Sequence, residues 1–194
     1  MKNVLRALRQ RKFQALAATV IAAGAIAATV AVPAVAAPAS VAKPANVSRC
    51  TTSDLRVWLG VPGDGTAGPI YYALELSNIS SHTCTLYGYP GVSAVGLGGK
   101  QLGSPARRNA VVAPHLVTLG RGATAHVELG ITDPGFYSPS ACPRANAIGL
   151  RVYPPNATVS AIVPFAFAAC GKKGPQFLSV STVIAGVGVP GYNV

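Results

Sequence analysis

Hydrophobic and polar residues alternate along much of the chain after Cys50. The alternation is regular over the segments 55–59, 72–76, 125–129 and 148–152. A period of two is typical of strands that bury one face and expose the other. The segments 159–167 and 177–183 are rich in β-branched and aromatic residues, so they are also predicted to be strands.

Turn-forming residues separate these predicted strands. They cluster at 62–65, 89–91, 98–99, 120–122, 133–135 and 154–156. The 21 Gly and 16 Pro residues leave little room for helices. We therefore predict an all-β fold, an antiparallel immunoglobulin-like β-sandwich of about 7–9 strands. Trp58 follows Cys50 too closely to be the tryptophan of the immunoglobulin fingerprint, so the prediction depends on the number of strands and turns.

The first 36 residues have the pattern of a secretory signal peptide. Basic residues without any acid precede an apolar run from Phe13 to Val32, and Ala34 and Ala36 provide a small-x-small cleavage site. We predict cleavage after Ala36, a flexible linker over 37–49 and a β-sandwich domain over 50–194. A retained membrane anchor is the alternative, because about 20 apolar residues can also span a bilayer.

The exported part of the chain contains all four cysteines, Cys50, Cys84, Cys142 and Cys170. An even number of cysteines in an oxidising compartment indicates disulfide bonds, and four cysteines allow three pairings. We favour Cys50 with Cys84 and Cys142 with Cys170, because each pair would enclose a compact unit of two or three strands. A zinc site is not predicted, because the spacing lacks a Cys-x-x-Cys pair.

Removal of the signal peptide lowers the net charge from +11, because it leaves 11 Lys and Arg against 5 acids. Arg107–Arg108 and Lys172–Lys173 are short pairs without interleaved aromatic residues, so nucleic-acid binding is not expected. A secreted basic protein would be attracted to anionic polymers of the cell envelope. The predicted partner is therefore such a polymer or a surface protein, with membrane contact only through an uncleaved leader.

The sequence lacks the common catalytic motifs, including the Gly-x-Ser-x-Gly and His-Glu-x-x-His patterns. His126 and Glu128 share one face of a predicted strand, which makes them a candidate acid–base or metal-binding pair, although two such residues on an exposed face are common. We predict a non-enzymatic protein that uses neither a cofactor nor a metal. The alternative is a secreted hydrolase that acts on cell-envelope material with the His126 and Glu128 face.

Aromatic residues supply the candidate ligand-binding surface. Tyr87 and Tyr89 are predicted to project from one face of the same strand, and Phe136 and Tyr137 lie in the proline-rich loop 133–144. Aromatic side chains on loops at one end of a sandwich are a common way to bind sugars or peptides. The simpler interpretation is that these rings cover the edge of the core with their polar ends in water.

The run 83–91, Thr-Cys-Thr-Leu-Tyr-Gly-Tyr-Pro-Gly, resembles the signature of a family of exported actinobacterial domains of unknown function, of the DUF 4232 type. The preceding run 74–80, the segment 119–123 and the later cysteines fit the same family, and the resemblance covers about residues 50–183. It implies an exported or surface-attached β-sandwich without an established activity, and it supplies no catalytic residues.

Overall fold

The computed structural model describes residues 46–62 and 68–188. The predicted signal peptide and the linker as far as residue 45 lie outside this part of the chain. Within it the secondary structure consists of strands and three short 3-10 helices, η1 (Thr52–Asp54), η2 (Leu97–Gly99) and η3 (Pro134–Phe136). The predicted all-β class is confirmed.

The described residues form twelve strands, and nine of these are three or more residues long. The bounds are β1 (Leu55–Pro62), β2 (Ile70–Asn78), β3 (Cys84–Tyr87), β4 (Gly91–Val95), β5 (Gln101–Leu102), β6 (Arg107–Arg108), β7 (Leu116–Leu119), β8 (Thr124–Ile131), β9 (Arg144–Tyr153), β10 (Ala161–Cys170), β11 (Leu178–Val180) and β12 (Ile184–Ala185). The three strands beyond the predicted number, β5, β6 and β12, have only two residues each, which is too short to show an alternation.

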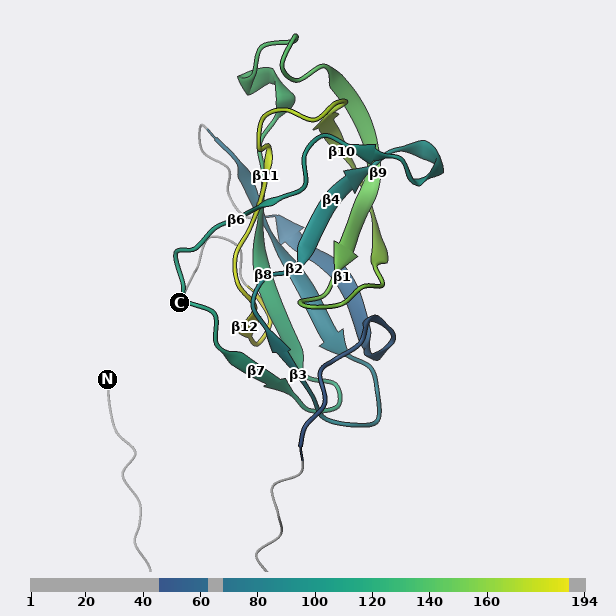
Figure 1. The fold of residues 1–194 in the computed structure, drawn as a ribbon, viewed down its shortest axis with the longest axis vertical. Coiled ribbons are helices and arrows are strands. Elements are labelled where there is room, and N and C mark those ends of the chain that lie inside the picture. Colours follow the sequence, from purple (N-terminus) through teal and green to yellow (C-terminus); the bar gives the residue numbers. More distant parts are fainter. Residues whose placement is uncertain (1–45, 63–67, 189–194) are drawn as a thin grey trace, which may run out of the picture. The chain divides into compact units, whose positions relative to one another are not determined.

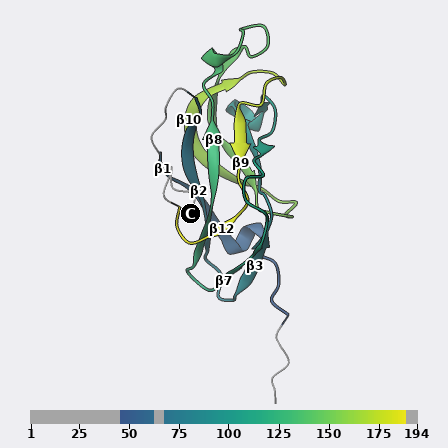
Figure 2. The same cartoon turned by 90° about the vertical axis from the view of Figure 1, so that its left-hand side faces the viewer.

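The strands form two larger sheets and one small pair (Figures 1 and 2). One sheet has the order β1-β2-β8-β11-β6, with β12 also paired to β8, and the other has the order β10-β9-β4-β5. Strands β3 and β7 pair separately. Neighbouring strands are antiparallel except for β6 and β11, which are parallel.

Hydrophobic residues from both larger sheets meet in one core. Among its fully buried members are Leu74, Leu76, Val127, Leu129, Leu150 and Val152. The alternation of the sequence correctly places all six of these side chains.

The alternation predicts that Ile148 lies on the buried face of its strand together with Leu150. This prediction is wrong, because Ile148 is 47% exposed whereas Leu150 is buried. The partner strand β10 has an extra residue between Pro164 and Phe167, so its register against β9 shifts at this point. Such a bulge locally disrupts the ladder and bends the strand. A regular period of two therefore does not continue through this part of β9.

Two disulfide bonds join Cys50 to Cys84 and Cys142 to Cys170, which is the pairing favoured from the sequence. The first encloses β1 and β2, and the second encloses β9 and β10. In the part of the chain that the structure describes, we find no helix with the length and hydrophobicity that a membrane span requires.

The C-terminal segment 181–188 follows β11 and lies along β8. Its amide nitrogens donate hydrogen bonds to the body of the domain, from Gly186 to the Thr124 carbonyl oxygen at 2.8 Å and from Gly188 to Glu75 Oε1 at 2.9 Å. This segment covers the face of β2 on which the alternation predicts a solvated side chain. Glu75 is consequently only 1% exposed.

Candidate functional site

The corner between β3 and β4 carries the two tyrosines that the sequence singles out. Strand β3 ends at Tyr87 because Gly88 has a φ of 95°, a left-handed conformation that only glycine adopts readily. Tyr89 therefore lies in the loop and not on the same strand face as Tyr87. The Gly88 carbonyl oxygen fixes this corner, because it accepts hydrogen bonds from Val183 N at 2.9 Å and from Thr182 Oγ1 at 3.2 Å.

The turn between β9 and β10 faces this corner. Its Ala157 amide donates to the Pro154 carbonyl oxygen at 2.9 Å, which closes a four-residue turn. Asn156 occupies the third position with a φ of 62°, and asparagine tolerates this left-handed region better than most residues. Asn156 Nδ2 then donates a hydrogen bond to the Tyr87 carbonyl oxygen at 3.2 Å, which ties the turn to β3.

Arg108 approaches the corner from the short strand β6. Its backbone is held because Arg108 pairs with Val180 of β11 and because the Asn109 amide donates to the Val180 carbonyl oxygen at 2.7 Å. The Arg108 guanidinium carbon lies 5.4 Å from the centre of the Tyr89 ring, within the range of a cation–π interaction. This contact favours a position of the exposed Arg108 side chain beside the Tyr89 ring.

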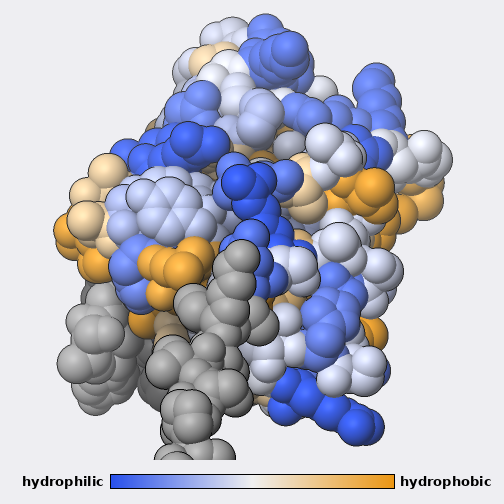
Figure 3. All heavy atoms as spheres, turned by 60° about the horizontal axis from the view of Figure 1, so that its bottom comes forward, coloured by the Kyte–Doolittle hydropathy of each residue, from blue (hydrophilic) through white to orange (hydrophobic). Residues whose placement is uncertain are grey.

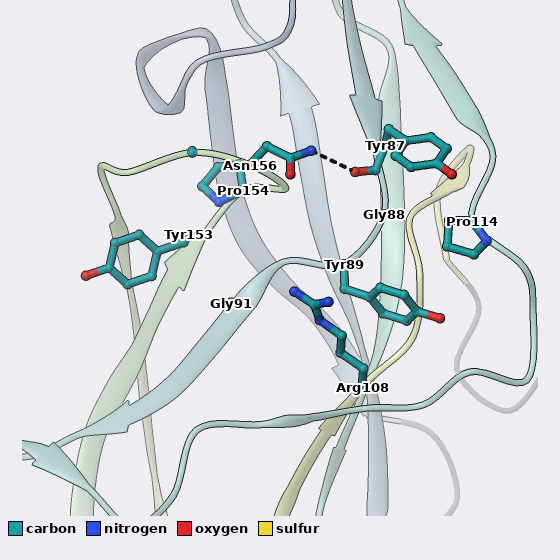
Figure 4. Close-up of a pocket in the computed structure, with 10 residues that line it drawn as sticks. Tyr87, Gly88, Tyr89, Gly91, Arg108, Pro114, Tyr153, Pro154 and Asn156 are labelled. Carbon is teal, nitrogen blue, oxygen red and sulfur yellow. Dashed lines mark hydrogen bonds between the residues drawn. The ribbon is translucent and has the colours of Figure 1, made fainter.

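These segments enclose a hollow of about 460 Å³, which we call the Tyr89 hollow (Figure 4). Its lining consists of Tyr87, Gly88, Tyr89, Gly91, Arg108, Pro114, Tyr153, Pro154, Asn156 and Ala157. In Figure 4 the rings of Tyr87 and Tyr89 lie on the side of Pro114, whereas Tyr153 lies on the other side with its hydroxyl group pointing away. The volume falls within the range of small-molecule sites, roughly 300–1,000 Å³.

A second, smaller hollow of about 210 Å³ adjoins the first, and we call it the Arg49 hollow. It is lined by Arg49, Thr85, Tyr87, Leu116, Pro155 and Asn156, so Tyr87 and Asn156 belong to both hollows. The backbone of Arg49 is held by a parallel bridge to Thr85 and by the adjacent Cys50–Cys84 disulfide. We call the two hollows together the tyrosine groove.

The tyrosine groove combines positive charge with aromatic rings. Arg49 and Arg108 contribute the charge, and none of the described residues that line the groove is acidic. Three described acids are engaged elsewhere: Asp54 with Thr51, Glu75 with Gly188, and Asp133 with Arg144.

Figure 3 shows the surface at the end of the molecule where β3 and β7 lie. Hydrophilic and hydrophobic residues are mixed on this surface.

The structure does not bring Phe136 and Tyr137 to the groove. They lie in and after η3, at the end of the molecule opposite to β3 (Figures 1 and 2). Phe136 is 61% exposed, whereas Tyr137 packs partly against the core and donates a long hydrogen bond, 3.5 Å, to the Gln176 carbonyl oxygen. The two aromatic pairs named from the sequence therefore belong to separate surfaces.

His126 and Glu128 lie on β8, as the alternation predicts. His126 Nδ1 is 2.8 Å from the Gly186 carbonyl oxygen, and the ring lies so close to Gly188 that a Cβ there would approach it to 2.7 Å. The C-terminal segment therefore packs directly onto the imidazole. Within the described residues no cluster of three or more metal-ligating side chains occurs.

Sequence reasoning misses Arg49, Arg108, Tyr153 and Asn156 as groove residues. They come from three separate segments, since Tyr153 and Asn156 are neighbours at the end of β9, and only the folded topology brings these segments together. One local signal was present for Asn156, because an asparagine after two prolines favours a turn with a left-handed residue.

A family model matches residues 50–183 of the chain. The chain belongs to the family described as Domain of unknown function (DUF4232). The matched range contains every residue that lines the Tyr89 hollow and, apart from Arg49, every residue that lines the Arg49 hollow. No curated protein and no solved structure matches the chain.

Proposed function

We propose that this protein is an exported, non-enzymatic binding module that recognises an anionic polymer of the cell envelope through the tyrosine groove. The observation that carries the proposal is the Arg108 guanidinium beside the Tyr89 ring at a hollow without acidic lining residues. A cation next to an aromatic face offers charge to an anionic group and a flat apolar surface to the ring that bears it.

Export is part of this proposal. The two disulfides are compatible with an oxidising compartment, and such bonds are rare in proteins of the cytosol. The basic and apolar pattern of residues 1–36 is the second support, because it is typical of a secretory leader.

The rigidity of the groove also supports a role in binding. The carbonyl oxygens of Tyr87 and Gly88 accept hydrogen bonds from the Asn156 side chain and from the C-terminal segment, respectively. A site whose groups are already held in place loses less conformational entropy when a ligand binds.

Sedimentation of the purified protein with isolated cell-wall material tests this function. We expect saturable retention that falls at high salt and that is lost in the Arg108→Gln and Tyr89→Ala variants. Lys173→Gln is the matched control, because it removes one exposed positive charge that does not line the groove. Retention that is equal in wild type, Arg108→Gln and Tyr89→Ala would refute the proposed function.

A further inference from the structure

The two hollows of the tyrosine groove share one wall. Tyr87 and Asn156 form this wall, and the hydrogen bond from Asn156 Nδ2 to the Tyr87 carbonyl oxygen holds its two sides together. Tyr87 is 52% exposed and lines both hollows, so its ring is accessible to a ligand at the boundary between them. A ligand that passes over this ring can enter both hollows.

Each hollow has its own arginine, and the backbone of each arginine is held by a different part of the fold. Arg49 is bridged to Thr85 of β3, whereas Arg108 pairs with Val180 of β11. Two cations that project from separate anchored backbone positions match two anionic groups better than they match a single one.

The apolar surface of the groove also extends into both hollows. Leu116, which is 63% exposed, pairs with Tyr87 across the β3–β7 ladder and lines the Arg49 hollow. Tyr89 and Tyr153 line the larger Tyr89 hollow. The C–H faces of sugar rings pack well on tyrosine rings and leucine side chains, while the acidic groups of the sugars remain free to reach the arginines.

We propose that the groove contains two adjacent subsites, and that its ligand is a sugar chain with a negative group on each of at least two residues. One sugar ring occupies the Tyr89 hollow with its acidic group at Arg108. A neighbouring residue of the chain passes Tyr87 and places its acidic group at Arg49. This proposal rests on the proposed function and adds the class of ligand and the role of Arg49.

Calorimetry with defined oligosaccharides tests the two subsites. The probes are galacturonic acid, tetragalacturonic acid and the fully methyl-esterified tetrasaccharide, which retains the sugar rings but lacks the charges. We expect the tetramer to bind at least about tenfold more tightly than the monomer and the ester to bind neither subsite. An oligomer of glycerol phosphate is a fourth probe, because it carries repeated charges without sugar rings and should bind more weakly than the tetramer.

Substitutions then separate this inference from the proposed function. Arg49→Gln should weaken tetramer binding about tenfold and leave monomer binding unchanged, whereas Arg49→Lys should retain most of the affinity. Arg108→Gln should weaken the binding of both. Arg121→Gln is the matched control, because Arg121 is exposed and lines neither hollow. Thermal unfolding under non-reducing conditions checks that each variant is folded.

The outcomes are distinguishable. If Arg108→Gln abolishes binding to wall material but Arg49→Gln binds the tetramer like wild type, the two-subsite inference is wrong and the proposed function remains. Equal affinity for the tetramer and for the glycerol phosphate oligomer would also overturn the inference, because charge alone would then explain binding. If the folded protein binds none of the four probes but is retained by the protein fraction of the cell walls, the proposed sugar ligand is wrong.

Discussion

Glu75 provides a sharp test of how the C-terminal segment packs on the sheet. Its carboxyl group is buried, with Oε1 accepting the Gly188 amide at 2.9 Å and Oε2 without a hydrogen-bond partner among the described residues. Burial raises the pKa of Glu75 above its ordinary value of 4.5, and the Gly188 hydrogen bond and a positive charge on His126 partly oppose this. The folded state therefore holds the Glu75 proton more tightly than the unfolded state does.

This difference fixes the sign of the pH dependence. The contribution of Glu75 to stability is fully present below its ordinary pKa and is lost as the pH rises through the raised pKa of the folded state. Glu75→Gln stays neutral at every pH and keeps an oxygen acceptor for Gly188. Above the raised pKa wild type carries a buried charge whose Oε2 has no partner, which costs about 1–3 kcal/mol or more, whereas the amide of the variant carries no charge. We therefore expect the free energy of unfolding of the variant to rise by about that much relative to wild type as the pH increases from 4 to 8.

The assay is urea denaturation of both proteins across this pH range with the disulfides intact. Repeating the comparison in a His126→Gln background removes the imidazole of the residue that pairs with Glu75 across β2 and β8 and whose positive charge lowers the pKa of Glu75. If the free energy of unfolding has the same pH dependence in wild type and in Glu75→Gln, the C-terminal segment does not cover Glu75 in solution.

Two further substitutions test local geometry by denaturation. Hydrogen bonds from the Thr51 hydroxyl and, to a smaller extent, from the Thr51 amide lower the pKa of Asp54, so Asp54→Asn should lower the free energy of unfolding at pH 7, by about 1 kcal/mol or less because solvent screens these exposed contacts. This loss should disappear as the pH falls through the lowered pKa of Asp54, and an unchanged loss at pH 2 would contradict the sign. Gly88→Ala should cost about 1–2 kcal/mol because of the positive φ, whereas Gly120→Ala, which also has free space but no positive φ, should cost less. Equal costs for the two glycines would contradict the assigned backbone conformation.

The strands were largely predictable, because a single physical rule governs them. Where one face packs on the core and the other meets water, as at Leu74, Leu76 and Val127, the alternation reports the burial correctly. Glu75 shows where this rule fails. The strand pattern around it is regular, but a segment more than 100 residues later covers its outer face, and a local pattern contains no information about that contact.

The candidate site was predictable only in part. Tyr87 and Tyr89 stand out because two tyrosines flank a glycine in a short segment that ends in Pro-Gly. Arg108 does not stand out, because its position depends on the parallel pairing of β6 with β11. The sequence indicates the turn that contains Asn156, but it does not show that this turn contacts Tyr87. Phe136 and Tyr137 join the tyrosines as candidates only because exposed aromatic residues are common in binding sites, and the fold places the two pairs at opposite ends.

Residue-resolved NMR spectra of the labelled protein during titration with tetragalacturonic acid show directly whether an anionic sugar chain binds in the tyrosine groove. We expect saturable shifts of the backbone amides of Tyr87, Tyr89 and Asn156, with the amides of Phe136 and Tyr137 unchanged. Shifts confined to the loop 133–144, or no saturable shift at the tyrosine groove, would contradict it.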